Sequence, residues 1–226
     1  MNWHTIFHRL QWILGGISIV LILPTIYSLF EDVDSTPAYL FTSAISLILG
    51  FLIKRFYRGG GIFRLREGLI FLVLSYLITI FICAIPIWLI ADVSLYEALF
   101  ESTSGLTTSG ATIFEDVESL AAHLQFWRAF LQSIGGLAII LLFLYVPSIK
   151  GVAGLQLSRQ ESVRIQSPGS QFGKKIWGIP QIIFKILFLY ISLHILSSIW
   201  MVLGGLDLHD AICHSFGIWA TAGFSN

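Results

Sequence analysis

Long apolar stretches dominate this 226-residue chain and restrict its fold more than any other feature. Each stretch is close to the length of about 20 residues that a helix needs to cross the hydrocarbon core of a bilayer. Because backbone amides and carbonyls in that core must be paired within the protein, such stretches fold as helices. The sequence therefore predicts an all-α integral membrane protein with five transmembrane helices, at residues Leu10–Phe30, Tyr39–Phe56, Gly68–Ala91, Leu124–Pro147 and Ile179–Leu203.

Charged residues make up 12% of the sequence, against about 25% in soluble domains. Lys and Arg cluster after the second and fourth stretches, whereas Asp and Glu cluster at the opposite ends. The positive-inside rule then places the N-terminus and both basic connections in the cytoplasm, in a multi-pass protein embedded in the lipid bilayer. The formal net charge is +0, and no nucleic-acid partner is expected.

Small and polar residues inside the apolar stretches need a separate interpretation. Gly15-Gly16 and Gly135-Gly136 are predicted to allow close contact between helices, as small residues do in membranes. Arg128 has two equally supported interpretations, because its side chain could extend outward to water or brace a neighbouring loop from behind. His194 is predicted to be a hydrogen-bonded packing residue.

The third and fifth apolar stretches are each followed, on the outer side, by a similar segment. Residues 95–113 and 208–226 align without a gap. Repeated units in membrane proteins often surround one shared site, so the repeat points to a single functional centre. The identical pairs include Leu95 and Leu208, Ala98 and Ala211, Ser102 and Ser215, Thr108 and Thr221, and Gly110 and Gly223.

Each segment begins with residues of helical character, too few to span the bilayer, and then breaks into small residues around a glycine. Irregular backbone at membrane depth is tolerated where it lines a water-filled path or is buried in protein. Glycine allows successive carbonyls to turn toward one axis, where they replace the water around an ion. The segments therefore predict two short re-entrant pore helices with filter loops. An ordinary helix contact or an outer loop would explain one segment alone, but the matched pair favours the pore.

Three motifs resemble a known family. The segments ALFESTSGLTTSGAT and FWRAFLQSIGGLAII resemble the first pore unit of the Trk/Ktr/HKT superfamily of potassium transporters, and AICHSFGIWATAGFSN resembles its second pore loop. The additional N-terminal helix pair and the segment VPSIKGVAGLQLSRQE are similar to the bacterial TrkH-like branch. The resemblance covers nearly the whole chain and implies potassium uptake across the bacterial inner (plasma) membrane.

In that family, four units of helix, pore loop and helix surround one potassium pathway, and the filter lies around the glycine of each loop. The resemblance further implies a homodimer, a cytoplasmic nucleotide-binding regulatory subunit, and no cofactor besides the permeating K⁺. Among the implied filter residues, Thr108, Ser109, Thr221 and Ala222 are the foremost K⁺ ligands. The full implied set is Thr108, Ser109, Gly110, Ala111, Thr221, Ala222, Gly223 and Phe224.

The expected organisation is a two-helix membrane unit at 1–66, a first pore unit at 67–150, and a second pore unit at 151–226. The chain ends at Asn226, directly after the second filter segment. We therefore expect the N-terminal part of a larger pore, in a truncated product. Pairing of two copies, or completion by another chain, are the alternatives.

Two other classes of function are alternatives to transport. A non-conducting membrane scaffold or subunit would explain half a pore. An intramembrane enzyme would need a reactive constellation, but no HExxH, GxSxG or paired-aspartate pattern occurs, so no enzyme is expected. The candidate polar residues for that role are Asp92, His123, His194, His209 and His214.

Overall fold

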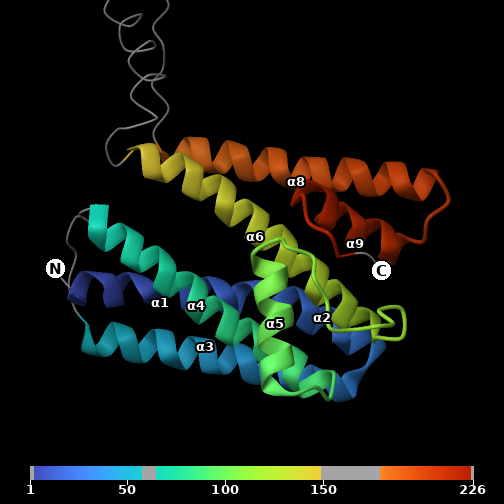
Figure 1. Ribbon diagram of the computed structural model, residues 1–226, viewed down its shortest axis with the longest axis horizontal. Helices are drawn as coiled ribbons and strands as arrows, with labels where there is room; N and C mark the ends of the chain where they lie inside the picture. The colour runs from blue at the N-terminus through green and yellow to red at the C-terminus, as the bar shows by residue number, and fades with distance from the viewer. Residues whose placement is uncertain (1–2, 58–64, 149–178, 225–226) are drawn as a thin grey trace, which may run out of the picture.

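The computed structural model describes residues 3–57, 65–148 and 179–224, and in these ranges the chain is helical without strands (Figure 1). The long helices run in one general direction across the view, while α5 runs steeply across α3. The elements are α1 (Trp3–Val20), α2 (Ile22–Glu31), the 3₁₀ turn η1 (Val33–Ser35), α3 (Thr36–Phe56), α4 (Leu65–Ile90), α5 (Leu95–Leu106), α6 (Ala122–Ser148), α8 (Ile179–Leu203) and α9 (Leu208–Trp219).

Within the described ranges, five helical segments are long and apolar enough to cross a membrane. They confirm the five predicted transmembrane helices, and the protein is a multi-pass membrane protein. The first helix begins earlier than predicted, at Trp3. The segments are Trp3–Glu31, Val33–Phe56, Arg66–Ile90, Ala122–Leu141 and Ile183–Leu203.

The first spanning segment consists of α1 and α2, which are separated at Leu21. The helical hydrogen bonds continue through this point, since the amide of Leu21 donates to the carbonyl of Ile17 over 3.0 Å. Pro24 lies in the first turn of α2 and has no amide to donate to Val20. A proline inside a helix removes one backbone bond and kinks the axis, which accounts for the break within one span.

The sequence repeat is also a structural repeat. The two short helices begin and end 113 residues apart: α5 runs from Leu95 to Leu106, and α9 runs from Leu208 to Trp219. The same shift relates the C-terminal residue of α4 to that of α8. The connection between the long and the short helix is matched as well. Asp92 and Gly205 occupy equivalent positions in the two connections, and both have a positive φ, of 52° and 99°. The repeated unit is therefore a long helix, a left-handed turn and a short helix.

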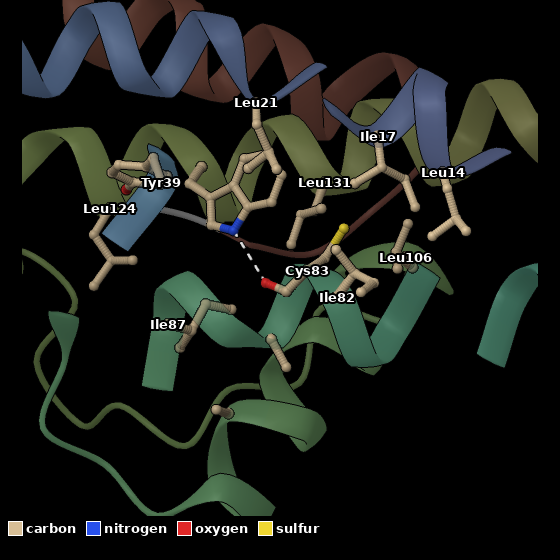
Figure 2. Packing of buried hydrophobic residues seen from close by; sticks show 13 residues of the cluster. Leu14, Ile17, Leu21, Tyr39, Ile82, Cys83, Ile87, Leu106, Leu124 and Leu131 are labelled. Atoms are coloured by element: carbon tan, nitrogen blue, oxygen red, sulfur yellow. Dashed lines mark hydrogen bonds between the residues drawn. The ribbon is translucent and has the colours of Figure 1, made fainter. Parts of the chain in front are cut away.

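A core of buried apolar side chains joins α1, α3, α4 and α6 (Figure 2). Trp127 of α6 is fully buried in this core. Its indole Nε1 donates to the carbonyl of Cys83 on α4 over 3.3 Å. Indole nitrogens need such a partner when they are buried, so this bond fixes α6 against α4. Both helices flank the first short helix, α5.

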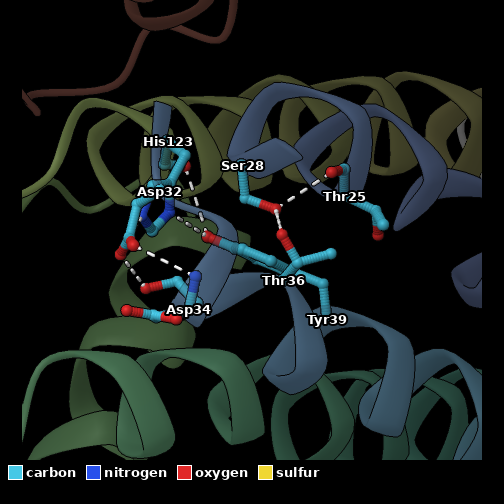
Figure 3. Close-up of polar contacts among 8 residues, drawn as sticks. Thr25, Ser28, Asp32, Asp34, Thr36, Tyr39 and His123 are labelled. Atoms are coloured by element: carbon cyan, nitrogen blue, oxygen red, sulfur yellow. Dashed lines mark hydrogen bonds and ion pairs between the residues drawn. The ribbon is translucent and has the colours of Figure 1, made fainter. Parts of the chain in front are cut away.

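Polar side chains join the helix ends at the acidic connections (Figure 3). The hydroxyl of Tyr39 lies 3.0 Å from Nδ1 of His123, and Nε2 of His123 lies 3.7 Å from the Asp32 carboxylate. The hydroxyl of Tyr27 lies 2.8 Å from Nδ1 of His209. These contacts bring the starts of α3, α6 and α9 to the end of α2. The acidic connections therefore lie together at one end of the molecule, while the basic residues between 149 and 178 lie outside the described residues.

Candidate functional site

The two short helices begin with matched caps. Ser94 forms a capping box with Glu97: its amide donates to the Glu97 carboxylate over 2.8 Å, and its hydroxyl accepts from the Glu97 amide over 3.3 Å. At the start of α9, the carboxylate of Asp207 accepts from the amide of His209 over 3.0 Å. The side-chain bond from Ser94 holds the pKa of Glu97 below its usual range. Side-chain caps at equivalent positions, Ser94 and Asp207, thus begin the two short helices.

Each short helix ends in the same turn. Thr108 and Thr221 both adopt the left-handed region, with φ of 57° and 52°. Non-glycine residues rarely adopt this conformation, so its occurrence at both equivalent positions marks a specified turn. The backbone hydrogen bonds that close the turn are also repeated. In the first copy, the amide of Thr108 donates to the carbonyl of Gly105 (3.0 Å) and that of Ser109 to the carbonyl of Ser104 (3.0 Å). In the second, the amide of Thr221 donates to the carbonyl of Ile218 (3.0 Å) and that of Ala222 to the carbonyl of Gly217 (2.9 Å).

The two loops meet at their glycines. A Cβ added to Gly110 would lie 2.6 Å from the backbone nitrogen of Gly223 and 2.8 Å from its carbonyl carbon. Gly110 also has a φ of 75°, which L side chains rarely adopt. Segments 113 positions apart are therefore in backbone contact, as expected of two loops that share one centre.

The loop carbonyls remain available for a ligand. Among the described residues, no hydrogen bond ends on the carbonyl of any residue from 108 to 110 or from 221 to 223. Backbone carbonyls are obligatory acceptors, and rings of them replace the water shell of ions in filters. The arrangement is chemically suited to coordinating a dehydrated cation.

The glycine pair of α6 positions both short helices. A Cβ on Gly135 would overlap the carbonyl of Leu106 at the end of α5, and one on Gly136 would lie 2.9 Å from Cα of Ala220 at the end of α9. The predicted close contact is thus confirmed for this pair. For Gly15 and Gly16, nothing within the described residues lies within 4 Å of an added Cβ, so close contact at that pair stays a prediction.

Arg128 braces the first loop from behind. Its guanidinium contacts the carboxylate of Glu101 on α5, through Nε at 2.6 Å and Nη2 at 2.5 Å, and both side chains are at most 2% exposed. Nη2 also donates to the hydroxyl of Thr112 over 2.8 Å, and Glu101 accepts from the amide of Ile113 over 3.1 Å. The structure therefore selects the bracing interpretation over extension to water.

The same arginine reaches the second loop. Its Cζ lies 4.5 Å from the centre of the Phe224 ring, a distance within the range of cation–π interactions. Phe224 is 9% exposed, so its side chain packs behind the loop. One buried ion pair thus contacts both predicted filter segments.

His194 supports the second copy from α8. Its Nδ1 lies 3.1 Å from the carbonyl of Ser215 on α9, and its Nε2 lies 3.0 Å from the hydroxyl of Ser133 on α6. A carbonyl only accepts, so Nδ1 carries the proton in this arrangement. The prediction of a hydrogen-bonded packing histidine is confirmed.

The structure brings together the loops that contain the eight predicted filter residues. It does not test their binding of K⁺ or their insertion into the bilayer, and both stay predictions. Sequence analysis missed Glu101 and Gln132, two buried polar residues beside the loops. The signal for Glu101 was present, because an acid inside a short apolar helix requires a partner.

These features define a class: a multi-pass helical membrane protein with repeated units of a long helix, a short helix and a loop, whose loops converge. A family comparison agrees with this class. The model of the TrkH family, described as cation transport proteins, matches residues 36–226, so the chain belongs to this family.

Similar proteins agree with this assignment. The chain is 30% identical to the Trk system potassium uptake protein TrkG of Escherichia coli K12, over 96% of this chain and 45% of that protein. It is 31% identical to TrkH of the same strain, over 91% and 42%. The crystal structure of the potassium transporter TrkH from Vibrio parahaemolyticus matches with a TM-score of 0.84 and 27% identity, over 100% of this chain and 44% of that one. The chain thus spans about half the length of these relatives, which are named as transporters and not as enzymes.

Proposed function

We propose that this chain is part of a potassium uptake protein and supplies two of the loops of its carbonyl-lined filter. The observation that carries the proposal is the backbone contact between Gly110 and Gly223, two equivalent positions of a structural repeat. The names of the relatives, potassium uptake proteins and a potassium transporter, give the ion. K⁺ is the cargo, and the foremost ligands are the predicted residues of the two loops: Thr108, Ser109, Thr221 and Ala222.

The short helices are re-entrant in this proposal. α5 and α9 have 12 residues each, which corresponds to about 18 Å of helix, less than the roughly 30 Å of a hydrocarbon core. Each helix ends at its loop, and the C-terminal end of a helix carries partial negative charge. Two such ends aimed at one point favour a cation there.

The remaining parts of the transporter follow from the family. Residues 1–66 form a two-helix unit, and residues 67–150 and 151–226 contribute the first and second pore units. By this resemblance, the filter needs two further units of the same kind. By the same resemblance, the protein is a homodimer in the bacterial inner membrane, has its N-terminus in the cytoplasm, and binds a cytoplasmic nucleotide-binding regulatory subunit.

Potassium uptake in a host that lacks its own uptake systems tests the proposal. The gene product, with any continuation of its reading frame, is expected to restore growth at low potassium. Gly110→Leu and Gly223→Leu should abolish uptake, whereas the matched control Gly15→Ala, at a position with no neighbour within 4 Å among the described residues, should not. Stable insertion with no uptake by the unmodified protein would contradict the proposal, as would undiminished uptake by both leucine variants.

A further inference from the structure

An apolar groove runs along α1, α4 and α6. Its volume is about 480 Å³, within the range of small-molecule sites. On each helix the lining residues recur every three or four positions, as one face of a helix requires. They extend from Leu131 to Leu141 on α6 and from Gly68 to Cys83 on α4, which corresponds to about 15 Å and about 22 Å of helix. The groove is therefore elongated in the direction of the spans.

The inner end of the groove reaches the base of the first loop. Leu106, the last residue of α5, lines this end together with Ile17, Cys83 and Leu131 from three other helices (Figure 2). All four side chains are at most 7% exposed. The other end lies where α1 and α4 begin, and Trp12, which lines it there, is 71% exposed. The groove thus leads from an accessible end to the support of the first loop.

The hydroxyl groups of two polar residues in the groove are used by the protein itself. The Ser75 hydroxyl donates to the carbonyl of Phe71, and the Thr79 hydroxyl to the carbonyl of Ser75, over 2.7 Å each. Tyr76 also lines the groove, and its hydroxyl has no hydrogen-bond partner among the described residues. The other residues of the lining are aliphatic, aromatic, glycine or cysteine. A strongly polar ligand would leave its own groups unpaired there, at a cost in free energy, so the lining favours an apolar one.

Gly16 contributes open space to this groove. It lines the groove from α1, and no atom of the described residues lies within 4 Å of a Cβ added to it. Glycine in a helix interior is about 1 kcal/mol less favourable than alanine, and no described neighbour makes it necessary here. A side chain at this position would project into the groove. The glycine therefore keeps room for something other than the described protein.

We infer that the groove binds an acyl chain of a membrane phospholipid. Its lining belongs to the spans Trp3–Glu31, Arg66–Ile90 and Ala122–Leu141, so the surrounding medium is hydrocarbon. An acyl chain is apolar and elongated in the same direction as the groove, and it fills space that a close-packed interior would not leave empty. The exposed Arg66 in the first turn of α4 suits an anionic headgroup. The site rests on the membrane location of the spans and not on the proposed filter.

A matched pair of substitutions tests the site through lipid-dependent stability. Gly16→Leu fills the groove, whereas Gly15→Leu makes the same change one position away, outside the lining; neither position has a described neighbour within 4 Å. Phosphatidylglycerol is added to the delipidated whole gene product in detergent, and a ligand of the folded state raises the melting temperature. We expect a saturable rise in the unmodified protein and in Gly15→Leu, and at most about half of it in Gly16→Leu. Equal rises in the two variants would overturn the inference.

A second variant protects this test against misfolding of the first. Ala138→Leu narrows the same groove from α6 and should reduce the lipid-dependent rise in melting temperature in the same way. Tyr76→Phe should leave that rise unchanged, because an acyl chain accepts no hydrogen bond. Loss of the rise in Tyr76→Phe would show a ligand held by the hydroxyl and would overturn the assignment to an acyl chain.

The ligand can also be located directly. A density map of the whole gene product with phosphatidylglycerol that carries brominated acyl chains should show bromine beside Gly16, between α1 and α4. A groove filled by another segment of the gene product would overturn the site. None of these measurements requires transport, so a failure here is distinguishable from a failure of the proposed function.

Discussion

Gly110 and Gly223 are in backbone contact, but the contact is not symmetric. A Cβ on Gly110 would lie 2.6 Å from the nitrogen of Gly223, whereas a Cβ on Gly223 would lie 3.5 Å from Cα of Gly110, an ordinary van der Waals distance. Only Gly110 of the two has a positive φ, at 75°. The two loop glycines are therefore needed for different physical reasons.

This asymmetry predicts different stabilities for two equivalent substitutions. Gly110→Ala should destabilise the protein by about 2 kcal/mol or more, for two reasons. The added Cβ would overlap the backbone of Gly223, and an L residue is strained at the positive φ of this position. Gly223→Ala should cost less than about 1 kcal/mol, within the range of ordinary substitutions. Thermal unfolding in detergent measures both, and equal losses would show that the loops do not meet as described.

The glycines of α6 and α1 predict opposite effects of the same change. Gly135→Ala should destabilise by about 1–3 kcal/mol, because the methyl group overlaps the backbone of Leu106 and overpacks the junction with α5. Gly15→Ala should be neutral or stabilise by up to about 1 kcal/mol, since alanine is the better helix former. Melting temperatures of the two variants provide the comparison, and a stabilising Gly135→Ala would contradict the docking of α5 on α6.

The buried pair of Glu101 and Arg128 predicts a strongly non-additive double-mutant cycle. Removing either partner alone, as in Glu101→Leu or Arg128→Met, leaves one buried charge unpaired and should cost about 3–5 kcal/mol. The double variant should be more stable than either single variant, because no charge then remains buried. Additive losses would indicate that the two side chains do not interact in the folded protein.

Glu97 predicts a pH dependence of stability. The hydrogen bonds from Ser94 lower the pKa of its carboxyl in the folded protein. A lowered folded-state pKa contributes stability above the ordinary Glu pKa, and this contribution is lost as the pH falls through the lowered value. Ser94→Ala should therefore reduce the melting temperature near neutral pH and flatten its decline under acid conditions. Parallel melting curves of the two proteins across that pH range would contradict the capping box.

The sequence predicted the features that depend on local composition. The spanning helices follow from apolar length, and the repeat follows from matched residues at a constant shift. The partners of buried polar residues were harder to predict, because Glu101 and Arg128 are 27 positions apart and meet only after the loop between them has folded. The two glycine pairs show the same limit. Gly15-Gly16 and Gly135-Gly136 look alike in sequence, and only tertiary packing decides which pair meets a neighbouring backbone.

The proposed filter implies that the two converging loops select the transported ion. Gly223→Ala is the most direct probe of this role. The added Cβ would lie at ordinary contact distances from the opposite loop, so the substitution should leave the fold intact. The measurement is the ratio of potassium to sodium flux in liposomes that contain the whole gene product, compared with the same protein carrying Gly223→Ala. We expect selective potassium flux in the unmodified protein and a reduced ratio of potassium to sodium flux in the variant, at an unchanged melting temperature. An unchanged ratio and an unchanged flux in the variant would contradict it.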